Sequence, residues 1–374
     1  MQNDNLVNIV DLMVSNYNKN LETIKLIKQN NFKEINNPYN FEEKIINDIK
    51  FPEKQNLSFG GVDSGFINKQ LNFANITIIK EMGVRFDYEN FKLKKTTYFP
   101  KAYNLPKPYL TTSALELEEI VWNTSILRLN KEIDVATDIV GQENPVNFML
   151  LDGSIIPQYV SKPSNDSRLL KIYNELINKF INLYNVSKKN KIYLVGCIED
   201  SRADKFFNFL KSKVIQKDIK NDIYDPFLVF SLLEKNQRTC VVKYTDNPKE
   251  HPILKDFPEE ISNNLYICYI KLSDDDYPLR LEFIYFKEFG LSLKEYTDYL
   301  VSNISSISNF NKRYIYPAPV IEADIRSRLK LQEIESITIS ILEKTKKYGF
   351  RLPRRESRIF WKSYSYFFEL LFFK

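Results

Sequence analysis

Two apolar runs of the sequence end in an aspartate whose neighbours are glycine and serine. Asp63 closes the run in "GGVDSG", and Asp152 closes the run in "MLLDGS". Buried strands of an α/β sheet present their ends at one edge, where ligands often bind. Two carboxylates at one edge repel each other unless a cation lies between them, and Mg²⁺ or Mn²⁺ prefers such oxygen ligands. We therefore predict a divalent metal site that contains Asp63 and Asp152.

Phosphodiester cleavage by two ions about 4 Å apart requires about four carboxylates. A third candidate is Glu116 or Glu118 in "ALELEEIVW", and spacing alone does not choose between these two or exclude Glu119. The fourth is Asp324 in "PAPVIEADIRSRL", with Glu322 as its neighbouring competitor. Each acid alone has an ordinary explanation: Asp-Gly forms turns, a helical Glu faces solvent, and an Asp near a helix start complements the helix dipole. The hypothesis therefore depends on the four acids occurring together, in the order strand, helix, strand, helix.

Composition narrows the chemistry further. The chain has 374 residues, 43% of them hydrophobic, and a net charge of +5, so it can bury a large core and carry a mildly basic surface. The three cysteines are scattered and form no paired motif, which argues against a zinc site. The only histidine, His251, lies in a polar, proline-rich stretch and is expected on the surface. A mechanism that requires two histidines is excluded.

The elements that must position these acids follow from hydrophobic spacing. Helical periodicity is expected over 5–30 and again near 41–49, while alternation and β-branched residues predict antiparallel strands over 57–66, 73–88 and 91–99. Further along, the pattern predicts a helix, a strand, a helix, a strand and a helix, then three strands, a helix near 293–307 and a long helix after the proline-rich loop at 316–319. This order predicts an α/β fold with a mixed β-sheet flanked by helices.

The domain prediction is an N-terminal helical extension over 1–50, one nuclease-type domain over 51–345 and a C-terminal tail over 346–374. The apolar end of this tail is a candidate dimer or partner contact, with packing inside the chain as the equal alternative. The N-terminus lacks the basic start and apolar block of a secretory signal, and no apolar run is long enough for a membrane span. We therefore expect a cytoplasmic protein without membrane contact.

Several of these motifs resemble the NurA family of DNA-end-processing nucleases, whose core is RNase H-like. "GGVDSG" and "MLLDGSI" resemble its two aspartate strands, "LELEEI" its glutamate helix, and "YPLRLEF" its R-x-E-F strand. "VGCIEDSRADKF" is similar to a third motif that has a lysine where this chain has Glu199. "YPAPVIEADIRSRL" is similar to a C-terminal motif in which a histidine often stands at the position of Asp324. The resemblance runs from about Phe59 to Leu329.

By this resemblance Asp63 and Asp152 are metal ligands, joined by Glu116 or Glu118 and by Asp324. It implies a Mn²⁺ (or Mg²⁺) cofactor, exonuclease activity on DNA ends, endonuclease activity on single strands and a role in resecting double-strand breaks. It also implies a homodimer coupled to a HerA-type hexameric ATPase, and the chain itself has no P-loop motif. The alternative is a DNA-binding scaffold that has lost catalysis, which the departures at Glu199 and Asp324 favour. A guide-dependent nuclease of Argonaute type is improbable for so short a chain.

Basic and aromatic residues near the motifs are candidate DNA contacts. Arg326 lies two positions from Asp324 and is expected to hold a phosphate beside the scissile one. Arg202 or Lys205 is expected to replace the missing lysine of the third motif, unless Glu199 instead adds a metal ligand. Tyr316, or its neighbour Tyr314, is a candidate for base stacking.

Overall fold

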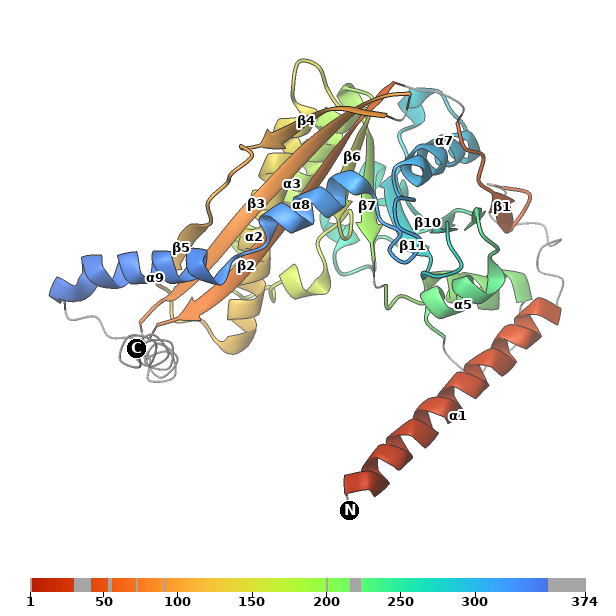
Figure 1. The fold of residues 1–374 in the computed structure, drawn as a ribbon, viewed down its shortest axis with the longest axis horizontal. Coiled ribbons are helices and arrows are strands. Elements are labelled where there is room, and N and C mark those ends of the chain that lie inside the picture. The colour runs from red at the N-terminus through yellow and green to blue at the C-terminus, as the bar shows by residue number, and fades with distance from the viewer. Residues whose placement is uncertain are drawn as a thin grey trace, which may run out of the picture.

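The computed structural model describes residues 2–29, 42–52, 56–71, 73–90, 92–199, 201–215 and 223–348. Within these ranges an 11-stranded mixed sheet runs in the order β1-β8-β10-β11-β7-β6-β2-β3-β4, with β5 paired to β3 and β9 to β10. Helices cover both faces of this sheet (Figure 1). The predicted class, a mixed sheet flanked by helices, is confirmed.

The strands are β1 (Ile46–Asp48), β2 (Leu57–Gln70), β3 (Asn75–Glu89), β4 (Lys92–Phe99), β5 (Lys107–Thr111), β6 (Phe148–Asp152), β7 (Tyr193–Ile198), β8 (Gln237–Thr239), β9 (Val242–Lys243), β10 (Leu265–Lys271) and β11 (Leu279–Ile284). The α-helices are α1 (Gln2–Gln29), α2 (Leu117–Val140), α3 (Leu170–Lys189), α4 (Lys205–Phe209), α5 (Asp225–Leu232), α6 (Glu259–Ser262), α7 (Leu293–Ser306), α8 (Ala318–Ser327) and α9 (Leu331–Thr345).

The strand pairing changes from antiparallel to parallel at β2. On one side, β2, β3 and β4 form the predicted antiparallel ribbon, because runs of β-branched and aromatic residues alternate across it. On the other side, β2 pairs with β6 in parallel and β6 pairs with β7 in parallel. Residues 148–151 of β6 are completely buried, as expected for a short parallel strand that is covered on both faces.

Glycines let two helices approach β2 from opposite faces. On the face covered by α2, a side chain at Gly60 or Gly83 would collide with side chains at Ile139 and its neighbours. On the face covered by α8, a Cβ atom at Gly61 would lie 2.5 Å from the backbone carbonyl carbon of Pro319, and one at Gly65 would meet the carbonyl of Ser327. The helix α8 therefore rests on β2 through backbone contacts, as Figure 1 shows from the α8 side.

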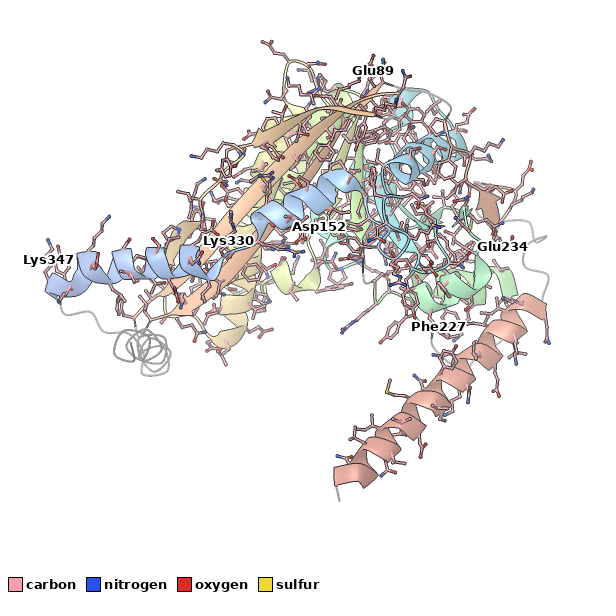
Figure 2. The ribbon with its side chains drawn as sticks, viewed as in Figure 1. Glu89, Asp152, Phe227, Glu234, Lys330 and Lys347 are labelled. Atoms are coloured by element: carbon pink, nitrogen blue, oxygen red, sulfur yellow. The ribbon has the colours of Figure 1, made fainter. Side chains whose placement is uncertain are left out.

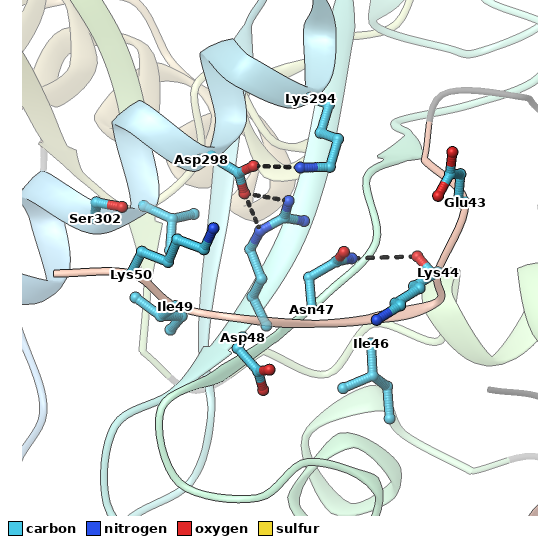
Figure 3. A pocket seen from close by; sticks show the side chains of 12 residues that line it. Glu43, Lys44, Ile46, Asn47, Asp48, Ile49, Lys50, Lys294, Asp298 and Ser302 are labelled. Atoms are coloured by element: carbon cyan, nitrogen blue, oxygen red, sulfur yellow. Dashed lines mark hydrogen bonds and ion pairs between the residues drawn. The ribbon is translucent and has the colours of Figure 1, made fainter.

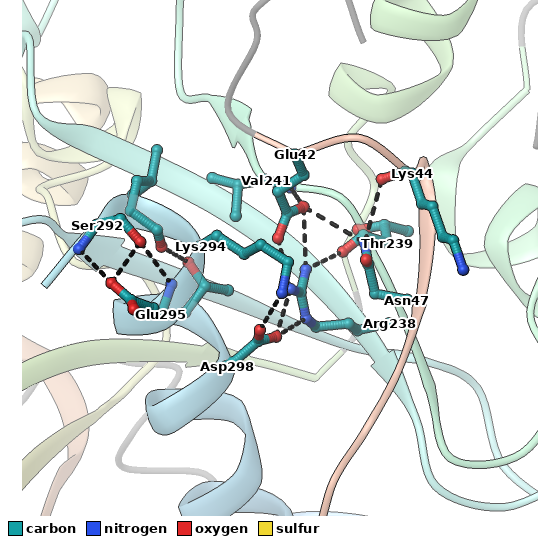
Figure 4. Close-up of polar contacts among 12 residues, drawn as sticks. Glu42, Lys44, Asn47, Arg238, Thr239, Val241, Ser292, Lys294, Glu295 and Asp298 are labelled. Atoms are coloured by element: carbon teal, nitrogen blue, oxygen red, sulfur yellow. Dashed lines mark hydrogen bonds and ion pairs between the residues drawn. The ribbon is translucent and has the colours of Figure 1, made fainter. Parts of the chain in front are cut away.

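The N-terminal segment corrects one prediction. The helix expected over 5–30 is confirmed as α1, but residues 46–48 form strand β1, so the helix predicted near 41–49 is wrong. Glu42 explains why: its carboxylate accepts a bond from the fully buried Arg238 at 3.1 Å and another from the Val241 amide at 3.0 Å. The Arg238 guanidinium also binds Asp298 of α7 at 3.0 Å (Figure 4). This buried network outweighs the local helical spacing.

Strand β1 passes along α7, with a pocket of about 250 Å³ between them (Figure 3). The segment is thus part of the sheet, and the division at residue 50 stays a prediction. The single long helix expected after the proline-rich loop is two helices, because the chain leaves the helical conformation at Arg328 between α8 and α9. The tail from 349 onward lies outside the described residues. Within the described ranges, no helix is long and apolar enough to cross a membrane.

The close seat of α8 yields the first prediction. Gly61→Ala places a methyl group against the Pro319 backbone, which cannot move without shifting α8. We expect the free energy of unfolding, measured by urea denaturation, to fall by about 1–3 kcal/mol. The control is Gly141→Ala at the exposed end of α2, which should change stability much less. Equal stability of Gly61→Ala and the wild-type protein would contradict the backbone contact.

Candidate active site

Asp63 and Asp152 lie side by side on neighbouring parallel strands. The last paired residues of β2 and β6 are Val62 and Leu151, and each aspartate is the next residue of its strand. Asp152 ends β6, whereas β2 continues to Gln70, so Asp63 lies in mid-strand at the point where its pairing with β6 stops. Two side chains at the same register of adjacent parallel strands point to the same face of the sheet. The predicted pairing of these two acids is therefore present.

Both aspartates are held by hydroxyl groups from the α8 segment. Ser327, the last residue of α8, donates to Asp63 Oδ2 at 2.5 Å. The buried Tyr316 hydroxyl lies 2.5 Å from Asp152 Oδ1 and 2.8 Å from the Cys197 carbonyl oxygen, so one proton is shared between two acceptors. The seat of α8 on Gly61 and Gly65 brings these hydroxyls to the carboxylates.

A third carboxylate, Glu132, was not predicted from the sequence. It lies on α2, almost completely buried, and its Oε2 accepts bonds from Ser64 at 2.7 Å and from Arg128 at 2.9 Å. Burial raises the pKa of Glu132 to about 7, Arg128 opposes this shift, and nearby Asp63 adds to it. A signal was present, because Glu132 shares a helical face with the apolar residues three, four and seven positions later.

The two glutamates predicted for this role are far from it. Glu116 is the N-cap of α2 and Glu118 lies in its first turn, and both are exposed. Glu118 precedes Glu132 by 14 residues of helix, which corresponds to about 21 Å along the axis. Neither side chain can reach Asp63 across that distance. The candidate glutamate of α2 is therefore Glu132, and Glu116 and Glu118 are helix-start residues.

Asp324 of α8 completes the cluster. Its carboxylate pairs with Arg328 one turn later. Burial raises the pKa of Asp152 to about 7, and the negative charges of Asp63, Glu132 and Asp324 raise it further against the hydrogen bond from Tyr316. The charges of Asp63, Glu132 and Asp324 therefore all act on Asp152 at the end of β6. Figure 2 shows Asp152 between the long ribbon and the second half of the sheet.

The donor set suits a hard divalent cation, because it consists of carboxylate oxygens with too little positive charge around them. Among the described residues, no three acidic, histidine or cysteine side chains are already gathered as a ready-made ligand set. The aspartates are satisfied instead by Ser327 and Tyr316. Asp63, Asp152 and Asp324, with Glu132 behind them, are the residues that would hold such a cation.

The turn after Asp152 is held by the R-x-E motif, which is Arg280 and Glu282 of β11. Gly153 adopts a positive φ of 108°, which glycine accepts without strain. The Glu282 carboxylate accepts bonds from Ser154 Oγ at 2.5 Å and the Ile155 amide at 3.2 Å, and it pairs with Arg280 at 2.6 Å. Glu282 and Arg280 are both buried, so this motif holds the turn in place from inside the protein.

The three basic residues predicted to contact DNA lie in different surroundings. Arg202 is exposed just after β7, and the Lys205 ammonium lies 5.8 Å from the Tyr244 ring centre. Arg326 is engaged: it pairs with Glu322 at 2.5 Å and stacks 4.2 Å above the Tyr98 ring. The three cations are therefore not gathered around Asp152.

Tyr316 cannot stack on a base, because it is 2% exposed and its hydroxyl is committed to Asp152. That expectation was wrong, and the residue positions a carboxylate instead. Its neighbour Tyr314 is 37% exposed, and partial burial, followed by a hydrogen bond with Glu199, raises the pKa of the Tyr314 hydroxyl. Glu199 therefore faces Tyr314 close to the end of β6, where the related motif has a lysine.

A family model for the NurA domain matches residues 57–353, most of the chain and all of the site just described. The chain belongs to the NurA family. It is therefore a member of a nuclease family, as the motifs predicted. Among curated proteins no sequence matches.

Two solved NurA structures are similar to this chain, and the first of them supports the fold. The NurA nuclease from Sulfolobus solfataricus is 14% identical, with a TM-score of 0.53 over 91% of this chain and 97% of that one. A second NurA structure, bound to dAMP and manganese, is 11% identical, with a TM-score of 0.42 over 77% of this chain and 88% of that one. The first similarity shows that this NurA-family chain shares the nuclease fold.

The raised pKa values give a prediction about pH. Asp152 and Glu132 have pKa values of about 7 in the folded protein against 3.8 and 4.5 ordinarily. Between about pH 4 and pH 7 the folded state therefore binds more protons than the unfolded state, and stability falls as the pH rises through this window. In EDTA, the stability of Asp152→Asn should match that of the wild type at about pH 4 and exceed it at pH 8 by about 1–2 kcal/mol, after allowance for solvent screening.

Thermal unfolding at both pH values measures this difference. The control is Asp204→Asn, an aspartate just before α4 that lies outside the acid cluster. An Asp152→Asn variant that is less stable than the wild type at pH 8 would show that the carboxylates do not repel one another.

Proposed function

We propose that this protein is a metal-dependent deoxyribonuclease that hydrolyses phosphodiester bonds at the cluster of Asp63, Glu132, Asp152 and Asp324. The observation that carries the proposal is the register of β2 and β6, which sets Asp63 beside Asp152 at the edge where β6 ends. NurA-family membership supports the reaction class. The strand order β4-β3-β2-β6-β7, with α2 between β4 and β6, supports an RNase H-like core.

Each carboxylate has a distinct position in this proposal. Asp63 and Asp152 present oxygens to the α8 face, Asp324 comes from α8 itself, and Glu132 comes from α2 on the other face. Bound divalent ions, Mn²⁺ or Mg²⁺ and two in the mechanism we favour, would activate water and stabilise the leaving oxygen. The protein's own contribution is to hold the four acids before the ions arrive: Asp63 through Ser327, Asp152 through Tyr316, Asp324 through Arg328, and Glu132 through Ser64 and Arg128.

The finer assignments rest on family resemblance. We propose exonuclease activity on DNA ends and endonuclease activity on single strands, in the resection of double-strand breaks. The proposed partners are a second copy of the chain and a HerA-type hexameric ATPase. Helix α1 supports a partner surface, because its first half exposes Leu6, Val10 and Met13 although the helix contacts α5 near its other end. Figure 1 shows α1 extending away from the sheet.

The first test is cleavage itself. Purified protein is incubated with end-labelled single- and double-stranded DNA in Mn²⁺, Mg²⁺ or EDTA, and we expect degradation only with metal. Asp63→Asn should lower the rate by about 10³-fold or more, because each carboxylate supports ions whose charge stabilisation is worth several kcal/mol. Tight DNA binding by the wild type without cleavage under any metal would instead identify a non-catalytic scaffold.

The second test decides which glutamate of α2 takes part. Glu132→Gln preserves shape but removes the charge that acts on Asp63 and Asp152. We expect it to lower the metal-dependent cleavage rate by about 10²-fold or more. Glu118→Gln is the matched control on the same helix and should cleave at the wild-type rate. The reverse result would return the role to the first turn of α2.

A further inference from the structure

A groove of about 570 Å³ runs along the outer side of α8. Its floor is formed by Lys80 and Met82 of β3, and one wall is the loop 102–105 between β4 and β5. The other wall is the second half of α8 and the start of α9, where the chain turns at Arg328. The groove is thus built from three segments that are distant in sequence.

The groove carries more positive than negative charge. Four cations line it, namely Lys80, Arg326, Arg328 and Lys330, against two carboxylates, Glu322 and Glu333. The carboxylates are already paired, Glu322 with Arg326 and Glu333 with Lys80. The Arg328 side chain is 70% exposed although it pairs with Asp324, and Lys330 is exposed at the start of α9 (Figure 2). Positive charge therefore remains for an anion.

The same groove exposes apolar surface. On the loop wall Tyr103 is 85% exposed and Leu105 is also exposed, and on α8 Ile325 is exposed beside the cations. The loop that carries Tyr103 is nevertheless fixed, because buried Asn104 donates to the Glu81 carbonyl at 2.7 Å and Arg326 donates to the Ala102 carbonyl at 3.3 Å. An exposed ring on a fixed loop opposite cations is the arrangement that binds unpaired bases and their phosphates.

The groove leads to the acid cluster. Arg328 lines it and pairs with Asp324, whose charge acts on Asp152. Ser327, the preceding residue, donates to Asp63. A strand lying in the groove would thus enter the site at α8, with Arg328 as the residue shared by groove and site.

We propose that this groove binds the unpaired strand of the nucleic-acid substrate, with a base stacked on Tyr103 and phosphates held by Arg328 and Lys330. The inference rests on the proposed nuclease function for its biological meaning, but the binding it describes needs neither metal nor cleavage. The mixture of exposed rings and cations favours single-stranded nucleic acid over a duplex, whose bases are not available for stacking.

The test is the affinity for a fluorescein-labelled oligothymidylate of 12 nucleotides, measured by anisotropy in EDTA so that cleavage cannot occur. Tyr103→Ala should weaken binding by about 5- to 150-fold, the range that one stacked base provides. The matched control is Tyr224→Ala, which removes another solvent-facing ring, 62% exposed, at the start of α5 in the other half of the molecule. It should bind like the wild type.

Salt dependence tests the phosphate contacts separately. Lys330→Gln should lower the slope of log affinity against log salt concentration by about 0.7, one phosphate contact to a single strand. Lys347→Gln, beyond the other end of α9, is the control and should leave the slope unchanged (Figure 2). Circular dichroism and melting of each variant separate loss of binding from loss of folding.

The outcomes distinguish this inference from the proposed function. Weak binding by Tyr103→Ala together with no cleavage by the wild type supports the groove and rejects the nuclease. Cleavage by the wild type together with Tyr103→Ala affinity within twofold of the wild type rejects the groove and keeps the nuclease. The groove is also rejected if the wild type does not bind the oligonucleotide, or if Tyr224→Ala weakens binding equally.

Discussion

The central physical constraint on this structure is the electrostatic repulsion among carboxylates that lie close together where the pairing of β2 with β6 stops. The parallel pairing of β2 with β6 stops at Val62 and Leu151, and the next residue of each strand is an aspartate. Burial and the neighbouring acids then hold the pKa of Asp152 near 7, which means that the protonated form competes with the charged one at neutral pH. Holding these carboxylates together lowers the stability of the folded protein. The hydrogen bonds from Tyr316, Ser327 and Arg128 offset only part of that loss.

The strand acids were predictable because their signal is local. An apolar run, an aspartate and small neighbours specify a buried strand that ends at an open edge, and both Asp63 and Asp152 are found at such an edge. The alternation of residues in β2 to β4 also predicted the antiparallel ribbon. One detail was not predictable: β2 continues past Asp63, since its length is set by pairing with β3 and not by its own sequence.

The failures share a different cause, which is that long-range partners decide them. "LELEE" concentrates acids where the helix starts, yet Glu132 alone faces Ser64 across the interface of helix and sheet. The helical spacing of residues 41–49 is overridden by Arg238, nearly 200 positions away in sequence, which captures Glu42. Tyr316 was one of two tyrosines proposed to stack on a base, and only the position of α8 on β2 reveals that it is buried with its hydroxyl on Asp152.

The glycines beneath α8 have an implication for how the site tolerates change. A helix that rests on a strand through main-chain atoms keeps its position whatever side chains its other faces carry. Position 324 can therefore change its side chain without displacing Ser327 or Tyr316. In the proposed active site, the aspartate at this position, where the motif that the segment resembles often has a histidine, would replace one coordinating group on an unchanged support.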